Sequence, residues 1–333
     1  MITVKDVAKA AGVSIATVSR VARNEDIVKP TMREHVRRVI KELNYQPNAL
    51  ARQMRAQSTR TVVIIVPDIG NTFFHEILVG IQTCAEENGY QTLIANMDNK
   101  QDIENRYFNA LLQRQMDGVI SLSANAARNL MERIAKRYPI VIACQYLDNK
   151  RIPNITIDNL GAAKYVTEYL IGLGHRRIAH LTSDPEKLLY RDRLAGYKAA
   201  LSEHGIGLDR KIIRGDKPSF EGGFRQMNEL LRLTKSVTAV FAAGDTMAIG
   251  AIKALQKAGK RVPGDVSVAG FDDIEFSSIF EPSLTTIRQP KYSIGYSAMG
   301  KLIKLMNGRK LDMSQEILDF ELIVRDSCGA RKR

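Results

Sequence analysis

The sequence predicts an all-α head joined to an α/β body. Residues 3–20 read as two short helices broken by a glycine turn, and from residue 61 onward short apolar runs alternate with helical stretches. Positive charge is concentrated in the head. Residues 1–60 hold twelve lysines and arginines against five acids, a net +7 of the +13 carried by all 333 residues. A small basic module attached to a less charged body is typical of proteins that bind a phosphate backbone.

The first element, TVKDVAKAAGVSIATVSR over residues 3–20, predicts a helix-turn-helix. Thr3 and Asp6 are spaced as a capping box for the first helix. Gly12 suits the turn, and Ser14 can cap the second helix. The outward side chains of the second helix are small or hydroxylated, with an arginine one turn later, and this pattern fits the major groove of DNA. These side chains are Ile15, Ala16, Thr17, Ser19 and Arg20.

A third helix is expected from Pro30 onward, with Thr31 and Glu34 spaced as its capping box. Its apolar residues fall on one face and would form a small core with apolar residues of the first two helices. The expected core residues are Val7, Val18, Val21, Val36 and Ile40, and the apolar face of the third helix also includes Val39 and Leu43. Residues 45–55 make a short amphipathic segment that should fold only against a partner, because so short a helix is marginal alone in water.

Two other interpretations of the head stay open on spacing and charge. Its helices could be an ordinary helical hairpin that covers a larger domain. Its basic surface could face solvent or an anionic membrane, although no strongly apolar helix face accompanies the charge.

The body is predicted to contain parallel sheets covered by helices on both faces, because its strands are continuous apolar runs separated by helical patterns. Strands are expected at 62–66, 91–95, 118–122, 140–144, 155–157, 178–181, 239–241 and 266–271. Helices are expected near 75–88, 102–114, 126–137, 160–172, 191–204, 221–233 and 245–258.

Ligands of such sheets bind beyond the carboxyl ends of the strands, and polar side chains follow several strands there. Carboxylates and amides can hydrogen-bond the hydroxyls of a sugar-like ring, and the adjacent Phe73 and Phe74 can stack on its faces. For any one polar residue, a helix N-cap is an equal alternative. It is the favoured one for Asp158 and Asp245, because each opens a helical pattern.

Enzymatic and metal-dependent functions find little support. The sequence has no nucleotide-binding glycine motif, no G-x-S-x-G elbow and no paired histidine spacing. Its three cysteines are isolated, which argues against a zinc site or a disulfide framework. We therefore expect no catalytic residue, no metal and no cofactor. The N-terminus lacks a secretory signal and no apolar run is long enough to span a membrane, so a cytoplasmic protein is expected.

Motifs along nearly the whole chain resemble the lactose/galactose repressor (LacI/GalR) family of bacterial transcription regulators. They include TVKDVAKAAGVSIATVSRV, PNALARQMR, VPDIGNTFFHEILVGI, GDTMAIGAI, VPGDVSVAGFDD and PSLTTIRQP. The resemblance implies a helix-turn-helix domain at 1–46, a hinge helix and linker at 47–60, and a periplasmic-binding-protein-like body at 61–333 for ligand binding and dimerisation. Within the body, subdomain one would take about 61–157 plus 291–321 and subdomain two 158–288 plus 322–333, joined by three crossovers.

The resemblance also implies residue roles. Ile15 and Ala16 would select the operator, and Leu50 would wedge into the central base step from the minor groove, while Ala49 and Ala51 let two hinge helices approach. The implied DNA-binding residues are Thr3, Ser14, Ile15, Ala16, Thr17, Ser19, Arg20, Asn48, Leu50, Ala51 and Arg52. The implied effector-binding residues are Asn71, Phe73, Phe74, Ser123, Gln145, Leu189, Arg193, Asp272 and Gln289.

The expected function is a sequence-specific transcription regulator, with repression as the expected mode. It would act as a homodimer on a near-palindromic double-stranded DNA operator, under control of a sugar or nucleoside effector. Two departures from relatives bear on the effector: Gln145 stands where many sugar binders have aspartate, and residues 188–190 differ from the polar set of the purine repressor. The alternatives are a cytosolic sugar-processing enzyme or a solute-binding protein with a basic N-terminal extension.

Overall fold

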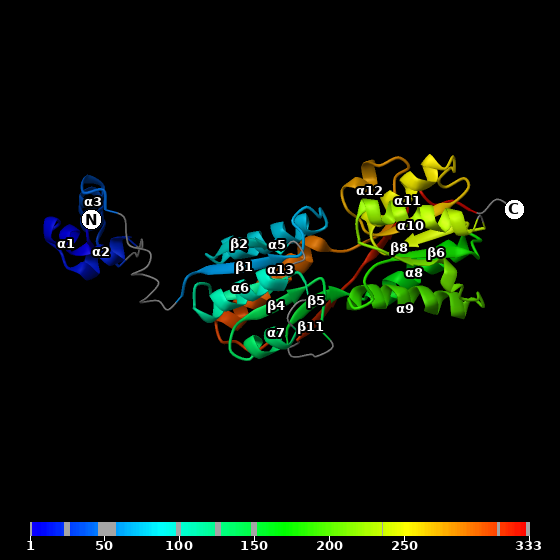
Figure 1. Cartoon of the computed structure of the whole chain (residues 1–333). Helices are drawn as coiled ribbons and strands as arrows, with labels where there is room; N and C mark the ends of the chain where they lie inside the picture. Colours follow the sequence, from blue (N-terminus) through cyan, green and yellow to red (C-terminus); the bar gives the residue numbers. More distant parts are fainter. Residues whose placement is uncertain are drawn as a thin grey trace. The chain divides into compact units, whose positions relative to one another are not determined.

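The computed structural model describes residues 2–22, 27–45, 58–97, 101–123, 128–147, 152–234, 236–311 and 314–330 (Figure 1). The chain divides into two compact units, Met1–Thr59 and Arg60–Arg333. We call them the head and the body.

The head contains helices α1 (Val4–Ala10), α2 (Ile15–Ala22) and α3 (Pro30–Glu42). Its core is formed by small apolar residues, of which Val7, Val18 and Val36 have no exposed surface. Ile40 in the last turn of α3 and Leu43 directly after it pack against this core. The inward residues predicted from helical spacing are therefore confirmed.

The turns and caps of the head follow the sequence with one exception. Gly12 has a φ of +63°, which glycine adopts without strain, and the Ser14 hydroxyl accepts a hydrogen bond from the Thr17 amide at 3.1 Å. Asp6 accepts from the Thr3 amide at 2.8 Å. The predicted Thr31–Glu34 capping box is wrong, because α3 already begins at Pro30, whose fixed φ suits the first helical turn.

The body consists of two lobes, each built on one six-stranded sheet. Lobe one has the strand order β11-β5-β4-β3-β1-β2, and all neighbours are parallel. Lobe two has the order β12-β10-β9-β8-β6-β7, with only β12 antiparallel to its neighbour. The predicted class of two largely parallel α/β sheets is confirmed.

The elements of the first half of the body are β1 (Thr61–Val66), α5 (Phe74–Glu87), β2 (Gln91–Asn96), α6 (Gln101–Leu112), β3 (Gly118–Ser121), α7 (Arg128–Ala135), β4 (Ile140–Ala143), β5 (Asn154–Ile157), α8 (Asn159–Gly172) and β6 (Ile178–Thr182). The second half has α9 (Leu188–Glu203), β7 (Ile213–Gly215), α10 (Phe220–Leu233), β8 (Ala239–Ala242), α11 (Asp245–Lys257), β9 (Ser267–Asp272), α12 (Phe276–Ile279), β10 (Thr285–Arg288), α13 (Lys291–Met306), β11 (Gln315–Leu318) and β12 (Glu321–Ile323).

Both faces of the lobe-one sheet are covered, as continuous apolar strands require. Val62, Ile64 and Val66 of β1 face the larger core, whereas Val63 and Ile65 face a separate cluster that includes residues of α6 and α7. Alternate residues of one strand are thus buried on opposite sides. No helix among the described residues is both long enough and apolar enough to cross a membrane.

The chain passes between the lobes after β5, after β10 and after β11. After the second passage, α13 packs along α5 in lobe one, as the adjoining ribbons in Figure 1 show. The two helices are in unusually close contact. A Cβ atom on Gly295 would lie 2.0 Å from the carbonyl oxygen of Ile77, and one on Gly80 would lie 2.2 Å from that of Tyr292. Glycine at both positions lets the two backbones touch.

Candidate functional site

The outward face of α2 is a small, mixed polar and apolar surface. Ile15 is 41% exposed, and Ser14, Ala16 and Arg20 are also exposed. The half-buried residues Thr17 and Ser19 lie between this face and the core. Exposed Thr3 lies at the start of α1, and Asn48, Leu50, Ala51 and Arg52 fall outside the described residues, as does most of the expected hinge helix. The head therefore presents short side chains and a cation on a helix whose opposite face holds the core.

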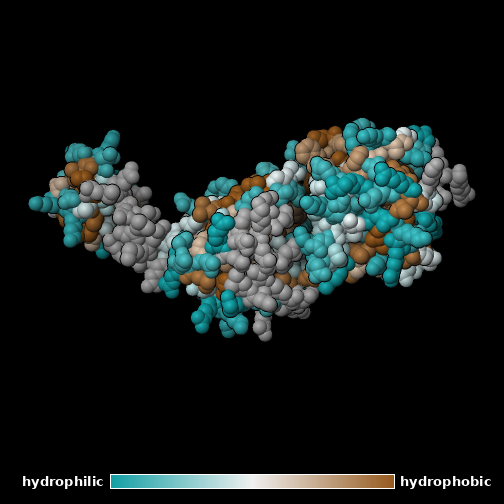
Figure 2. All heavy atoms as spheres, in the orientation of Figure 1, coloured by the Kyte–Doolittle hydropathy of each residue, from teal (hydrophilic) through white to brown (hydrophobic). Residues whose placement is uncertain are grey.

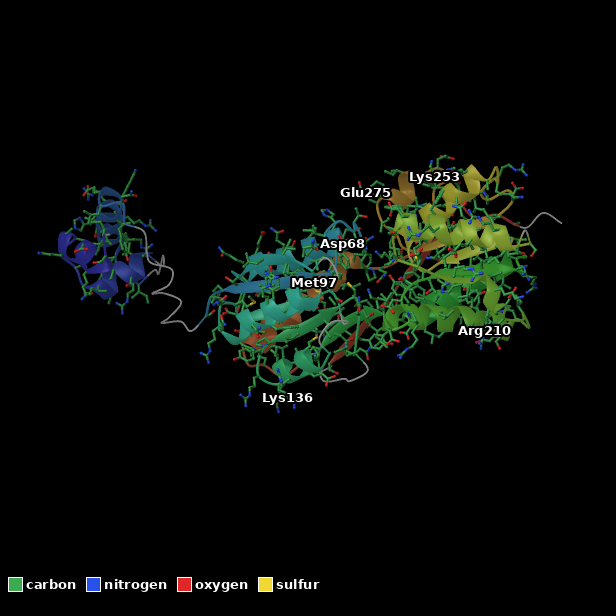
Figure 3. All side chains as sticks on the ribbon, viewed as in Figure 1. Asp68, Met97, Lys136, Arg210, Lys253 and Glu275 are labelled. Carbon is green, nitrogen blue, oxygen red and sulfur yellow. The ribbon has the colours of Figure 1, made fainter. Side chains whose placement is uncertain are left out.

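The two lobes of the body enclose a cleft of about 1120 Å³. One wall is the loop after β1 with the first turn of α5, and the other is the loop after β9. Residues of the passage into α13 line the cleft as well. Asp68 and Glu275, labelled in Figure 3, lie on the two sides of this junction. Of the expected effector residues, Asn71, Phe74 and Gln289 line the cleft itself.

Arg193 is the centre of a buried polar network beside the cleft. Its Nε donates to Oδ1 of Asn159 at 3.0 Å, and Nη1 donates to the carbonyl oxygen of Ala243 at 2.6 Å. Its Nη2 is 3.5 Å from Oδ1 of Asp272. The guanidinium also stacks on the Phe271 ring, 3.6 Å from the ring centroid. Helix α9 and strand β9 thus fix the direction of a cation that is only 5% exposed.

Asp272 ends β9 and carries the second charge of this network. Its Oδ1 accepts a hydrogen bond from Nε2 of Gln289 at 2.7 Å, in addition to the contact with Arg193. Burial raises the pKa of Asp272, whereas Arg193, Gln289 and Lys291 act in the opposite direction. Of the expected effector residues, the structure joins Arg193, Asp272 and Gln289 through hydrogen bonds. Asn159, which completes the network, was not among those residues.

The backbone at Asp272 and Asp273 is strained. Their φ values are +116° and +49°, a region that non-glycine residues rarely adopt, at a cost on the order of 1–3 kcal/mol each. The Asp273 carboxylate accepts from Arg288 at 2.7 Å and lies 2.7 Å from Nη2 of Arg325. Burial alone would raise the pKa of Asp273, but the hydrogen bonds from these two arginines lower it below its usual value.

The remaining expected effector residues follow strands of lobe one or lie at the start of α9. Phe73 and Phe74 are buried and meet edge to face, with ring centroids 5.2 Å apart. The Asn71 side chain accepts from the Phe73 amide at 3.0 Å, so part of its hydrogen-bonding capacity organises the start of α5. Ser123 is buried after β3. Gln145 and Leu189 are half-buried, one in the loop after β4 and the other at the start of α9.

A hydrogen bond next to Gln145 connects the lobes directly. The Tyr146 hydroxyl, from the loop after β4, donates to Oδ2 of Asp192 on α9. Burial and this hydrogen bond raise the pKa of Tyr146 to about 12. The pairing of Tyr146 with Asp192 could not be predicted from the sequence, because it joins two segments 46 positions apart.

The two strand-end aspartates that were expected to be helix caps behave differently. Asp158 is confirmed as the N-cap of α8, because its carboxylate accepts from the Gly161 amide at 2.9 Å. Asp245 is not a cap, since Gly244 takes that place at α11. Its buried carboxylate instead accepts from the Ile274 amide and the Ser277 and Thr286 hydroxyls. Burial raises the pKa of Asp245 to about 7, despite these three donors.

The described residues contain no cluster of histidine, cysteine or acidic side chains that could hold a metal ion. Cys84 and Cys144 are buried free thiols, and burial raises the pKa of each. A helix-turn-helix head with a two-lobed ligand-binding body defines a class of protein, the ligand-responsive transcription regulators.

Comparison with known proteins gives the same class. The model "Bacterial regulatory proteins, lacI family" matches residues 3–48, and "Periplasmic binding protein-like domain" matches residues 167–328. The HTH-type transcriptional repressor CytR of Escherichia coli (strain K12) is 37% identical over 329 residues, which cover 98% of this chain and 96% of the relative.

Solved structures agree along the whole chain. The lac repressor dimer bound to operator and the anti-inducer ONPF has a TM-score of 0.88 at 28% identity, covering 99% of each chain. The transcriptional regulator CelR–cellobiose complex has a TM-score of 0.75 at 32% identity, covering 98% of this chain and 100% of that one.

This chain belongs to the lacI family of bacterial regulatory proteins, and it is a DNA-binding transcription regulator. Its relatives are transcription regulators rather than enzymes, so the alternative of a sugar-processing enzyme is not favoured. The match of the head along with the body also separates it from a plain solute-binding protein.

Proposed function

We propose that this protein is a homodimeric repressor that reads an operator with α2 and binds a small sugar-like or nucleoside effector in the cleft of its body. The observation that carries the effector half is the buried network of Arg193, Asp272 and Gln289 at the cleft. Oriented carboxylate, amide and guanidinium groups are suited to a ligand with several hydroxyls. A related regulator has been solved with cellobiose, which supports a sugar.

The operator-reading surface of this proposal is the exposed face of α2. Ile15 and Ala16 are free of the core and lie at its start, where recognition helices contact base edges. Thr17, Ser19 and Arg20 would add contacts to phosphates and bases, and Thr3 and Ser14 contacts to the backbone. In the hinge at 47–60, Leu50 would wedge into the central base step, with Asn48, Ala51 and Arg52 beside it.

Homodimerisation is supported by exposed apolar surface on both lobes. Leu93 and Ile94 are 56% and 48% exposed on β2, an edge strand, and Val79 is 41% exposed on α5. Lobe two has an apolar groove of about 590 Å³ flanked by Phe220 and Phe276. Figure 2 shows apolar surface over α5 and near α12. An open apolar edge is a liability in a monomer, and a second copy would cover it. The similar lac repressor was solved as a dimer.

Effector and operator would be coupled through the angle between the lobes. The β1 end of lobe one follows the hinge segment directly, so a change in lobe angle changes the spacing of two hinges in a dimer. Short hinge helices are marginal alone, and their spacing would decide whether they fold on DNA. A coupling of about 1–3 kcal/mol, or roughly 5–150-fold in operator affinity, is typical of such systems. As a DNA-binding regulator, the protein would act in the cytoplasm.

Effector binding and its coupling to operator binding are tested separately. Full-length protein is screened by thermal shift with D-ribose, cytidine and cellobiose, since a ligand that binds only the folded state raises the melting temperature. Asp272→Asn should abolish the shift, whereas Asp216→Asn, which removes an acid paired with Arg225 on the surface, should leave it intact. An unchanged dose response in Asp272→Asn would remove Asp272 from the site. A compound that shifts melting but never alters operator affinity would contradict the coupling.

A further inference from the structure

Lys291 is a buried lysine at the point where the chain passes from lobe two into lobe one. It is the first residue of α13, and its side chain is only 4% exposed. Its Nζ donates to the backbone carbonyl of Asp272 at 3.2 Å and to that of Asp273, and it lies 3.0 Å from Oε1 of Glu76. An ammonium group has three protons to donate, so these three acceptors use all of them.

The two carbonyls belong to the strained turn that ends β9. A backbone with positive φ at two successive non-glycine residues persists only where its surroundings hold it in place. Arg288 and Arg325 hold this turn through the Asp273 carboxylate. Lys291 holds it from another direction, through the carbonyl groups of both aspartates.

The groups that Lys291 contacts belong to different lobes. The turn belongs to lobe two, and it directs the Asp272 carboxylate toward Arg193 and Gln289. Glu76 belongs to the first turn of α5 in lobe one, where it lines the cleft wall opposite the turn. A single buried ammonium therefore contacts both the backbone that orients Asp272 and a carboxylate of the other lobe.

We propose that Lys291 is a positioning residue that sets the orientation of Asp272 and the angle between the lobes together. The proposal deepens the proposed function and rests on it, because Asp272 is taken there as an effector contact. A ligand that engages the Asp272 carboxylate shifts the turn, the carbonyls at Lys291 move with it, and the ion pair with Glu76 transmits the movement to α5.

The two parts of this role, the orientation of Asp272 and the angle between the lobes, can be tested with different variants. Glu76→Gln removes the charge partner in lobe one but leaves both carbonyl contacts of the turn. Lys291→Met removes all three contacts and keeps an unbranched side chain that is one atom shorter. Lys291→Arg keeps a donating cation and serves as the conservative rescue. Lys301→Met is the matched control, because Lys301 lies on the same helix and pairs at 3.1 Å with Glu316, within lobe one alone.

The angle between the lobes is measured with two spin labels in the full-length chain, without effector or DNA. Lys136 in lobe one and Arg210 in lobe two are exposed and lie on different lobes (Figure 3). Both are replaced by cysteine, and the partly exposed Cys328 by alanine. Labelled chains are diluted with unlabelled chains, so that each pair of labels lies in one copy. The distance distribution is then read by pulsed electron resonance.

Lys291→Met and Glu76→Gln should both shift or broaden the distribution, whereas Lys291→Arg and Lys301→Met should match the wild type. Hydrogen exchange over residues 269–276 then reports on the turn alone, apart from the angle between the lobes. It should accelerate on the order of tenfold in Lys291→Met and stay at the wild-type rate in Glu76→Gln.

Two results would overturn the proposal: wild-type distances in both Lys291→Met and Glu76→Gln, or the same exchange rates in these two variants. If Lys291→Met does not fold, Glu76→Gln still decides, because Glu76 is 56% exposed and its replacement leaves the core intact. An unshifted distance in Glu76→Gln then overturns the proposal. Neither measurement uses an operator, so the absence of operator binding would count against the proposed function alone.

Discussion

Replacement of Arg193 by methionine tests whether the ion pair between Arg193 and Asp272 contributes to stability as a buried pair does or as a surface pair does. Arg193 is 5% exposed and contacts Asn159, Ala243 and Asp272. Methionine retains much of the apolar stem but removes the guanidinium that pairs with the largely buried Asp272 carboxylate. Removal of one partner of a buried pair typically costs about 3–5 kcal/mol. Because the Asp272 side chain is still 18% exposed, we expect the lower end, about 3 kcal/mol.

The matched control is Arg225→Met. Arg225 donates twice to Asp216, at 2.9 and 3.0 Å, but its own side chain is 52% exposed. Such surface pairs contribute about 0–1 kcal/mol, because water and salt screen them. The two variants therefore remove the same kind of ion pair at different depths.

The assay is urea unfolding of the full-length chain at pH 5 and pH 8. Burial already raises the pKa of Asp272, and loss of Arg193 raises it further. When a carboxyl has a higher pKa in the folded state than in the unfolded state, the protein loses stability as the pH rises from the unfolded-state pKa to the folded-state pKa. The penalty in Arg193→Met should therefore be larger at pH 8 than at pH 5. A penalty equal to that of Arg225→Met, or one that shrinks with rising pH, would refute the reasoning.

Three further predictions concern other parts of the molecule. Gly295→Ala should destabilise the body by about 1–3 kcal/mol, because its Cβ would overlap the Ile77 carbonyl. In the control Gly300→Ala, on the same helix, the added Cβ meets no atom, so this variant should gain stability. Equal effects of the two variants in urea unfolding would argue against the close helix contact. His180 is enclosed by Tyr197 and Phe241, and burial lowers its pKa to about 3. Between pH 7 and pH 5 the unfolded histidine takes up a proton that the folded one does not, so the wild type should lose about 2 kcal/mol relative to His180→Phe; parallel pH profiles would contradict this. Ala16→Ser should change the preferred operator in a binding selection, whereas Arg38→Ala, an exposed residue of α3, should weaken all sequences alike or not at all.

The head and most of the inner strands could be predicted from sequence because each has a strong local pattern. Val18 and Val21 in one helix, and Val36, Val39 and Ile40 in the next, recur at helical spacing, and runs such as 62–66 are apolar without interruption. The strands β7, β10, β11 and β12 were missed. All four are three or four residues long. β7, β11 and β12 are edge strands and only partly buried, whereas β10 is mostly buried but reads Thr-Thr-Ile-Arg, so none of the four carries a continuous apolar run.

The cleft could be predicted in part. Strand-end position and family resemblance identified Arg193, Asp272 and Gln289, which the structure joins by hydrogen bonds. Lys291 and Glu76 could not be found in this way, because their contact depends on the packing of segments more than 200 positions apart in the chain. For Asp245, the sequence pattern predicted the wrong role. Its position at a helix start predicted a cap, but burial and three donors from other elements give it a different role.

The central claim is that the basic head reads duplex DNA in a sequence-specific way under control of the body. The most direct measurement is a selection of genomic fragments by the full-length protein, at physiological salt and in excess competitor DNA. Enrichment of near-palindromic sites, lost in the Ala16→Asp variant, is the result we predict. Recovery of fragments no different from bulk DNA would contradict it.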